Sequence, residues 1–222
     1  MPSKPSTHSS EVSPVVGPPR LTRKRRLNHH YPVKQHRKAL STLLKESYNR
    51  CVYSLQHVDE IGGRMSMEVD HFNPKMTGLR RNWHGNLMAS ARLCNNTKRD
   101  HWPSPQQIKK GIRYLNPYLE LDYGVHIYEN RSTGEIHGVT PAGKWHIIRL
   151  GLNAEHLINA RKRRTNLVMK FTEAAILSGA DPSNQAIQVI LGKFTEVQKV
   201  VLATAIPELP DKANWPRKPP SI

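Results

Sequence analysis

The segment that most restricts the fold is a short run of alternating side chains that ends in Asp70-His71 and stops at Pro74. Apolar and polar residues alternate from residue 65 to 72, which is the period of a strand with one face on a core. One face carries Met65, Met67, Val69 and His71, and the other carries Ser66, Glu68, Asp70 and Phe72. Because neighbouring strand residues point to opposite sides, Asp70 and His71 can serve two different purposes at the end of one strand.

The charge of the chain narrows the class of its partner. Lys and Arg number 34 against 17 Asp and Glu, a formal net charge of +17. Such an excess favours a polyanionic partner, with nucleic acid ahead of an anionic membrane. We see neither an apolar run of membrane-spanning length nor an apolar signal segment, so we expect no membrane association. The two cysteines are typical of a reducing compartment, and we expect a cytoplasmic protein.

Composition divides the chain into four parts. Residues 1–30 are rich in Pro, Ser and basic side chains, and we expect them to form a disordered basic tail. The basic run at residues 20–26 of this tail either contacts phosphates or is simply solvated. The other expected parts are residues 31–110 with the strand and a preceding helix, residues 111–210 with a hairpin and a helical region, and a Pro-rich tail at residues 211–222.

Hydrophobic periodicity predicts an α+β fold. A helix is expected at residues 33–50, and the strand is followed by a polar loop at 75–85, an apolar stretch at 87–93 and a short helical turn at 95–101. Strands at 126–130 and 134–139 then form a hairpin, with a third strand at 145–150. A long helix is expected from 153 to 178, with Asn153 as N-cap and Glu155 in the first turn, before a further helix or helix pair at 184–206.

The polar residues around the strand suit the hydrolysis of a phosphodiester. This reaction needs a base for the attacking water and positive charge near the phosphate, which a neutral His and one divalent cation can supply. Within the Asp70-His71 pair, one side chain can face a metal and the other the water. Asn95 is a candidate for a second oxygen ligand, because Mg²⁺ accepts few protein oxygens and several waters. Loop residues around Asn86 can fix the tautomer of His71.

The spacing of this set resembles that of the HNH endonuclease superfamily. The matching residues are Asp70-His71, then Asn86-Leu87, then Cys94-Asn95-x-x-Lys98. The resemblance implies a compact ββα-metal core with flanking helices, in which two strands and a helix hold one divalent cation. Mg²⁺ is the expected metal, with Mn²⁺ as an alternative. The implied substrate is DNA, with RNA as an alternative.

The resemblance also assigns roles to individual residues. It implies that His71 is the general base and that Asp70 and Asn95 are the metal ligands. It further implies that Asn86 holds the loop and orients His71. Phosphate or DNA contacts are expected from Lys98, Lys75 and His84, although Lys98 can instead close the helix and His84 can be an ordinary loop residue.

A narrower similarity points to the retron-associated and Septu PtuB-type HNH proteins. It rests on Phe72-Asn73-Pro74-Lys75, Trp83-x-x-Asn86-Leu87, Cys94-Asn95-x-x-Lys98-x-Asp100 and Leu150-Gly151-Leu152-Asn153. Members of that group commonly accompany an ATPase in bacterial anti-phage systems. The resemblance therefore implies antiviral defence in a bacterial cytoplasm, with an ATPase as a partner.

The chain departs from these relatives at a structural zinc site. Relatives often carry two Cys-x-x-Cys pairs, whereas this chain retains only Cys51 of the first pair and Cys94 of the second. Two thiolates cannot complete a tetrahedral zinc site, even though His57 could add a third ligand. We therefore expect no structural zinc, and we expect Cys51 and Cys94 to be buried as small apolar residues.

Several alternatives remain open from the sequence. Asn82 competes with Asn86, Asn96 competes with Asn95, and Glu68 either adds charge at the metal or is solvated. The basic run at 161–164 either grips a nucleic-acid backbone or is a solvated helix face. The alternative function is a degenerate HNH fold that binds nucleic acid, or docks on a partner ATPase, without cutting.

Overall fold

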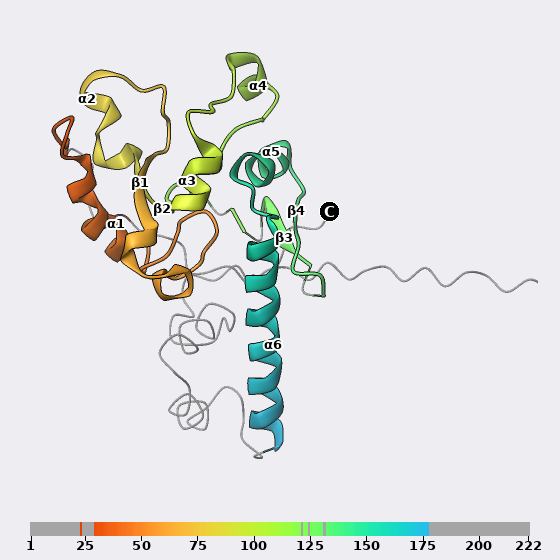
Figure 1. Ribbon diagram of the computed structural model, residues 1–222. Helices are drawn as coiled ribbons and strands as arrows, with labels where there is room; N and C mark the ends of the chain where they lie inside the picture. Colours follow the sequence, from red (N-terminus) through yellow and green to blue (C-terminus); the bar gives the residue numbers. More distant parts are fainter. Residues whose placement is uncertain (1–22, 24–28, 121, 124, 131, 178–222) are drawn as a thin grey trace, which may run out of the picture.

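The computed structural model describes residues 23, 29–120, 122–123, 125–130 and 132–177. These residues form an α+β fold with two separate two-stranded antiparallel sheets (Figure 1). The elements are η1 (His36–Ala39), α1 (Leu40–Glu46), η2 (Val58–Ile61), η3 (Arg64–Ser66), β1 (Met67–His71), α2 (Gly78–Arg81), η4 (His84–Asn86), β2 (Leu87–Ala91), α3 (Arg92–Lys98), α4 (Pro105–Lys109), β3 (Ile127–Glu129), β4 (Ile136–Gly138), α5 (Pro141–Leu150) and α6 (Glu155–Leu177). The predicted helices at 184–206, the Pro-rich tail and all of the basic tail up to residue 28 except Arg23 lie outside the described residues.

The first sheet is the hairpin of β1 and β2, paired from Met67↔Ala91 to His71↔Leu87. Strand β1 confirms the predicted strand over most of its length, although Met65 lies in the preceding 3-10 turn and is exposed. Every residue of β2 is buried, because the sheet is covered by helix α1 on one side and helix α3 on the other (Figure 1). Helix α3 follows β2 without a connecting loop, so its side chains are held close to the end of β1.

The helix expected at residues 33–50 is shorter than predicted. The α-helix covers only Leu40–Glu46 and is preceded by one 3-10 turn. The expected apolar stripe is present, since Ala39, Leu43 and Leu44 are buried. The helix ends early because Tyr48 and Asn49 both adopt positive φ, which interrupts the helical backbone. The loop expected at 75–85 also contains a short helical turn, α2.

The second sheet confirms the predicted hairpin, with β3 and β4 paired from Ile127↔Gly138 to Glu129↔Ile136. The third strand expected at 145–150 is wrong, because these residues belong to helix α5. The helix begins where Thr140 accepts a hydrogen bond from the Gly143 backbone N–H and Pro141 occupies the first turn. Its buried residues recur at helical spacing, and they include His146, Ile147 and Leu150.

Helix α6 begins at Glu155, and the prediction that Asn153 is its N-cap is wrong. The side chain of Asn153 instead reaches β4, where its Oδ1 accepts from Ile136 N and its Nδ2 donates to Ile136 O at 2.9 and 2.8 Å. Glu155 lies in the first turn as expected. Asn153 therefore attaches the start of α6 to the second sheet.

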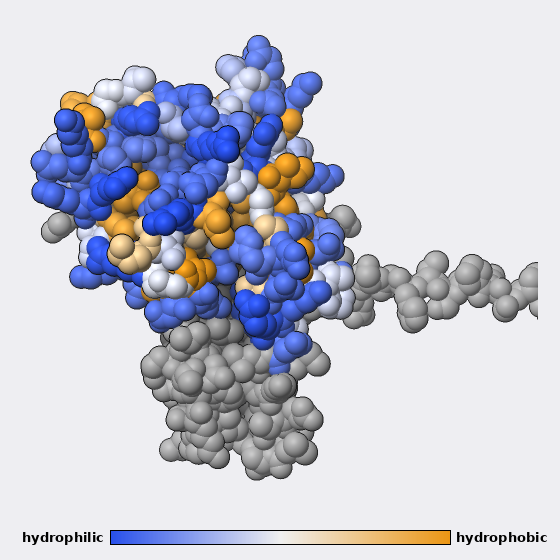
Figure 2. Space-filling model, viewed as in Figure 1, coloured by the Kyte–Doolittle hydropathy of each residue, from blue (hydrophilic) through white to orange (hydrophobic). Residues whose placement is uncertain are grey.

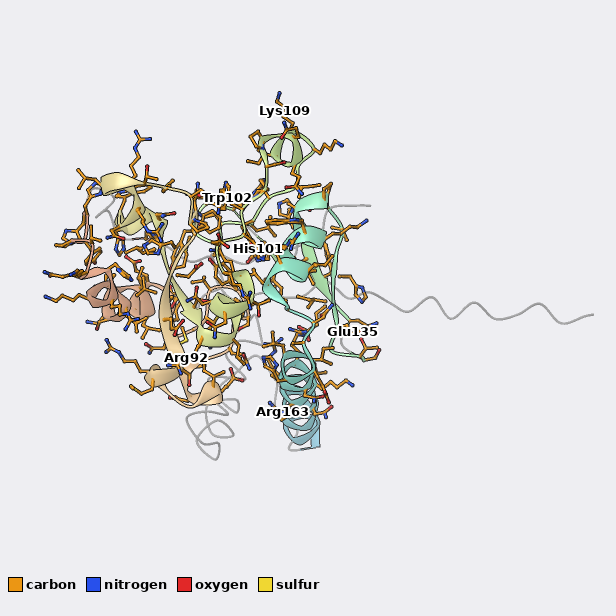
Figure 3. All side chains as sticks on the ribbon, turned by 45° about the horizontal axis from the view of Figure 1, so that its top comes forward. Arg92, His101, Trp102, Lys109, Glu135 and Arg163 are labelled. Carbon is orange, nitrogen blue, oxygen red and sulfur yellow. The ribbon has the colours of Figure 1, made fainter. Side chains whose placement is uncertain are left out.

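The basic run at 161–164 is divided between the core and the surface. Arg161 is buried, and Arg164 forms an ion pair with Glu129 at 2.8 Å. Lys162 and Arg163 are exposed, and Arg163 is labelled on α6 in Figure 3. Only two of these four charges are thus available to a nucleic acid. More generally, the face shown in Figure 2 is mostly hydrophilic, with small separated hydrophobic patches.

A helix that could cross a membrane would need to be both long and apolar, and among the described residues there is none.

Arg161 provides a test of how the C-terminal part is held together. Its guanidinium donates to the carbonyl oxygens of Gly134 and Leu152 at 2.5 and 2.7 Å. Arg161→Met should lower the free energy of unfolding by about 3 kcal/mol, because two buried carbonyls lose charged donors. Urea unfolding followed by circular dichroism measures the change.

Arg163→Met is the matched control, since it removes the same charge two residues away from an exposed position. Its expected effect is within about 0.5 kcal/mol of zero. Equal stabilities for the two variants would show that Arg161 does not hold α6 to the second sheet.

Candidate active site

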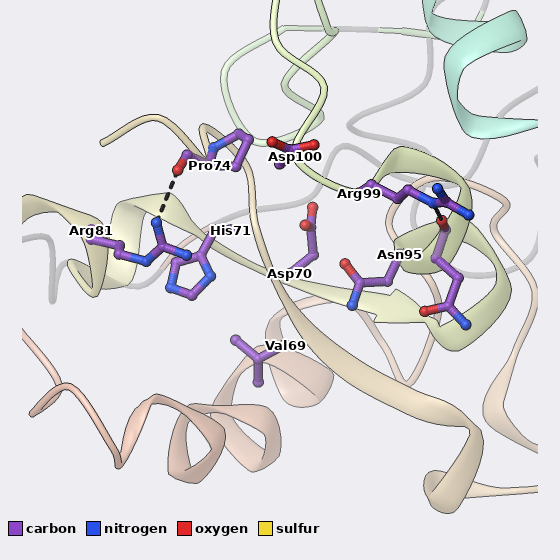
Figure 4. A pocket seen from close by; sticks show the side chains of 9 residues that line it. Val69, Asp70, His71, Pro74, Arg81, Asn95, Arg99 and Asp100 are labelled. Carbon is purple, nitrogen blue, oxygen red and sulfur yellow. Dashed lines mark hydrogen bonds between the residues drawn. The ribbon is translucent and has the colours of Figure 1, made fainter. Parts of the chain in front are cut away.

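A pocket opens where the end of β1 faces helix α3. Its volume is about 530 Å³, and the residues that line it are Val69, Asp70, His71, Pro74, Arg81, Asn95, Asn96, Arg99 and Asp100. Figure 4 shows Asp70 between His71 on one side and Asn95 on the other. The structure thus gathers three of the four residues expected to carry the chemistry, from a strand and from a helix that follows the partner strand.

The His71 ring is held by Asn82. Nε2 of His71 lies 2.9 Å from Oδ1 of Asn82, which is itself buried. An amide oxygen only accepts hydrogen bonds, so Nε2 carries the proton and Nδ1 keeps its lone pair. None of the described residues forms a hydrogen bond with Nδ1. The imidazole is therefore oriented with a basic nitrogen unused.

The surroundings of His71 favour its neutral form. Burial is the main reason that the pKa of His71 is lowered from its ordinary value. The hydrogen bond to Asn82 opposes the decrease, while the charges of Arg81, His36 and Lys98 add to it. A pKa below the ordinary value of about 6.5 leaves the ring neutral at pH 7, as a proton acceptor must be.

Asn86 holds the loop, but its side chain does not contact His71. Its Oδ1 accepts from Asn73 N at 2.8 Å, and its Nδ2 donates to the carbonyl oxygens of Asn73 and Arg81 at 3.2 and 3.0 Å. These bonds close the loop between β1 and β2 on itself. The expectation that Asn86 orients the His71 ring is wrong, because Asn82 from the same loop takes that position.

Asp70 is engaged in a buried network. Its Oδ1 receives a hydrogen bond from Lys98 Nζ at 2.9 Å, and its Oδ2 receives one from the Tyr53 hydroxyl at 2.5 Å. Lys98 also donates to the carbonyl oxygen of His71 at 2.7 Å. Burial raises the pKa of Asp70, although Lys98 and Tyr53 oppose the increase. Each carboxylate oxygen of Asp70 accepts one hydrogen bond and retains a second lone pair.

Lys98 cannot contact a phosphate as expected, because its ammonium is 0% exposed and is bound within the protein. The same correction applies to His84, whose side chain is 2% exposed and bonded to the Glu46 carboxylate at 2.9 Å. Lys75 remains at the surface, where it forms an ion pair with Asp100 at 3.0 Å beside the pocket. Of the three basic residues expected at the substrate, only Lys75 is accessible.

Asn95 is positioned by Glu68, which sequence reasoning left undecided. Asn95 Nδ2 donates to Glu68 Oε2 at 2.7 Å, and Arg92 Nε donates to Glu68 Oε1 at 3.2 Å. Because the nitrogen faces Glu68, the amide oxygen is turned to the side of Asp70 (Figure 4). The signal in the sequence was the spacing, since Glu68 and Asp70 lie on one face of the strand.

The oxygens that could hold a divalent cation are those of Asp70 and Asn95. Both line the pocket, and both retain free lone pairs. Mg²⁺ prefers oxygen ligands and keeps several waters, so two protein oxygens are enough for it. Sites made of nitrogen and sulfur favour other metals. In the part of the chain that is described, no group of three or more His, Cys, Asp or Glu side chains is arranged to hold a metal ion, and the candidate site offers one carboxylate and one amide oxygen.

The two cysteines meet beneath the site. Cys51 and Cys94 are both buried and are hydrogen-bonded to each other. The positions of the missing cysteines are occupied by Ser54, whose backbone N–H lies 3.4 Å from Cys51 Sγ, and Ala91, whose backbone also bonds Cys51. Cys51, Ser54, Ala91 and Cys94 therefore lie close together.

Comparison with known proteins adds no assignment. No model of a known protein family matches the chain, and no curated protein or solved structure matches it either.

The Asp70–Lys98 pair makes a measurable prediction. Lys98→Met should destabilise the protein by about 3–5 kcal/mol, because a buried carboxylate is left without its cation. In the Asp70→Asn, Lys98→Met double variant the losses should be smaller than their sum, with a coupling energy of about 1–3 kcal/mol. Chemical unfolding of the four proteins measures both quantities.

Lys75→Met is the matched control, because its ion pair with Asp100 is exposed. Its expected cost is below about 1 kcal/mol. A coupling energy near zero between Asp70 and Lys98 would contradict the proposed importance of the buried pair.

Proposed function

We propose that the chain is a metal-dependent endonuclease of the HNH type that hydrolyses phosphodiester bonds in DNA. The observation that carries the proposal is the position of His71. Its Nδ1 is unprotonated and unused among the described residues, and it belongs to the same pocket as the oxygens of Asp70 and Asn95. A base beside a pair of hard oxygen ligands is the arrangement that hydrolysis of a phosphodiester requires.

The protein residues have separate tasks in this proposal. His71 accepts a proton from the attacking water at Nδ1, and Asn82 holds the ring through Nε2. Asp70 and Asn95 bind the divalent cation, whose charge would offset the negative charge of the phosphate and the leaving oxygen. Glu68 keeps the oxygen of Asn95 turned into the pocket. Arg81, at the pocket wall beside His71, adds positive charge where the substrate would lie (Figure 4).

The local fold supports the HNH type within the nucleases. Strands β1 and β2 pair antiparallel, and α3 follows β2 directly, which is the order that the ββα-metal resemblance implies. The Asn86 side chain closes the intervening loop. The net charge of +17 favours a nucleic-acid substrate. A role in bacterial anti-phage defence with a partner ATPase follows only from the sequence resemblance.

A second candidate function is a nucleic-acid-binding or ATPase-docking module that does not cut. The observation in its favour is that both carboxylate oxygens of Asp70 are already hydrogen-bonded, one of them to a buried ammonium. A protonated lysine beside a metal ligand opposes cation binding by charge repulsion. The two functions differ in one measurable outcome, which is strand cleavage in the presence of Mg²⁺.

His71→Ala tests the proposed base. Cleavage of plasmid DNA in Mg²⁺ should fall by about 10²-fold or more, because a positioned general base contributes rate increases of that order. Circular dichroism and DNA affinity should stay close to those of the unaltered protein. EDTA should stop cleavage by the unaltered protein.

His137→Ala is the control, since His137 is exposed on β4 away from the pocket. It should cleave at the normal rate. Full cleavage by His71→Ala, or cleavage that persists in EDTA, would contradict the proposed mechanism.

The pH dependence of cleavage tests the state of His71. The rate should rise with pH as His71 loses its proton, and the midpoint of this rise should lie below the ordinary His pKa of about 6.5, because burial lowers the pKa of His71. Asn82→Ala should move this acid limb to lower pH, because the Asn82 hydrogen bond raises the pKa of His71. The maximal rate should also fall, since the ring loses its orienting partner.

Rates measured across pH at saturating Mg²⁺ separate the two effects. An acid limb that stays in place in Asn82→Ala would show that Asn82 does not act on the titrating group.

A further inference from the structure

Arg99 has a backbone conformation that is unusual for a residue with a side chain. It follows the last residue of α3, with φ of 50° and ψ of −134°. Glycine adopts this region readily, whereas a residue with a Cβ atom is strained there. Among the described residues, the non-glycine residues with positive φ are Tyr48, Asn49, Leu55 and Arg99. Of these, only Arg99 lines the pocket.

The turn at Arg99 is fixed by its neighbours. Lys98 must point inward to Asp70, and the Arg99 backbone N–H donates to Asn95 O at 2.8 Å as the helix closes. His101 N then donates to Lys98 O at 3.2 Å, which carries the chain away from α3. The backbone therefore takes this turn whichever residue stands at position 99, and glycine would fit it best.

The Arg99 side chain contributes little to the fold. It is exposed, and its Nε forms one hydrogen bond of 3.3 Å with the carbonyl oxygen of Asn96, three residues earlier. The part of the chain that is described offers it no ion pair. A strained position thus carries a charged side chain that makes only a weak local contact, so packing does not explain why an arginine stands there.

The position of Arg99 at the pocket gives the explanation. Figure 4 shows Arg99 on the side of Asn95 and Arg81 on the side of His71, with Asp70 between them. Two guanidinium groups therefore flank the oxygens expected to bind the cation. A guanidinium presents a planar pair of N–H donors that matches two oxygens of one phosphate.

We propose that Arg99 is a substrate-binding residue whose guanidinium leaves the Asn96 carbonyl and binds a phosphate of the nucleic acid at the Asn95 side of the pocket. The proposal rests on the proposed nuclease function for the identity of the substrate. It also explains why a strained residue is kept at this turn. Removing the side chain should make the protein more stable and a poorer DNA binder at the same time.

The test uses the full chain with His71→Ala, so that DNA is bound without being cut, and compares it with His71→Ala, Arg99→Gly. The probe is a short fluorescein-labelled DNA duplex, and anisotropy is measured over a range of salt concentrations. Arg99→Gly should raise the melting temperature, weaken binding by about tenfold or more and lower the salt dependence by about one phosphate contact. Arg99→Lys should retain part of the affinity but none of the gain in stability.

Two controls separate the effects. Arg64→Ala removes the same charge from an exposed residue that does not line the pocket, and Asn49→Gly relieves a positive φ elsewhere. Neither should change DNA affinity by as much as Arg99→Gly. Affinity and salt dependence that are unchanged in Arg99→Gly, or lowered equally in Arg64→Ala, would overturn the proposal.

Cleavage assays on the chain with His71 intact distinguish this result from a failure of the nuclease function. If the unaltered protein does not cut in Mg²⁺ while Arg99→Gly still loses DNA affinity, Arg99 is a phosphate-binding residue of a protein that does not cut. If the unaltered protein cuts and Arg99→Gly cuts and binds equally well, the nuclease function stands and the role of Arg99 is wrong.

Discussion

The buried ion pair between Lys98 and Asp70 joins helix α3 to the end of strand β1, and the geometry of the pocket depends on it. Lys98 Nζ bonds both the Asp70 carboxylate and the His71 carbonyl oxygen, so one ammonium fixes the two neighbouring residues of the strand. Taking two charges out of water is costly, and such a pair is favourable only when its remaining bonding capacity is satisfied. Here the Tyr53 hydroxyl supplies the second bond to Asp70.

The same ion pair determines what the pocket can bind. Because α3 is fixed at Lys98, Asn95 one turn earlier faces the same pocket as Asp70, and Arg99 one residue later is forced into its strained turn. The oxygens, the neutral imidazole and the exposed guanidinium are thus placed by one helix and one strand end. A cation bound at Asp70 would lie near the buried Lys98 ammonium. In our proposal the carboxylate can bind both, because each of its oxygens retains a lone pair that neither Lys98 nor Tyr53 uses.

Features that depend on local sequence could be predicted, and features that depend on distant partners could not. The alternation of apolar and polar residues predicted strand β1. The spacing of Asp70, His71 and Asn95 predicted that these residues act together, and all three line one pocket. Residues 145–150 were assigned to a strand because the start signal at Thr140-Pro141 was missed. Two features depend on how the loop and α3 fold back on β1, and spacing along the chain does not encode them. Lys98 points inward to Asp70, and the partner of His71 is Asn82 rather than Asn86.

The buried residues beneath the pocket, Cys51, Ser54, Ala91 and Cys94, connect two segments of the chain. Cys51, Ser54, Ala91 and Cys94 converge, so the segment that begins at Cys51 stays attached to the junction of β2 and α3. Tyr53 lies within that segment, and its hydroxyl reaches Asp70. A hydrogen bond from the segment that begins at Cys51 therefore reaches Asp70, the proposed metal ligand. Packing of these small buried groups in this way helps to determine where the carboxylate of Asp70 lies.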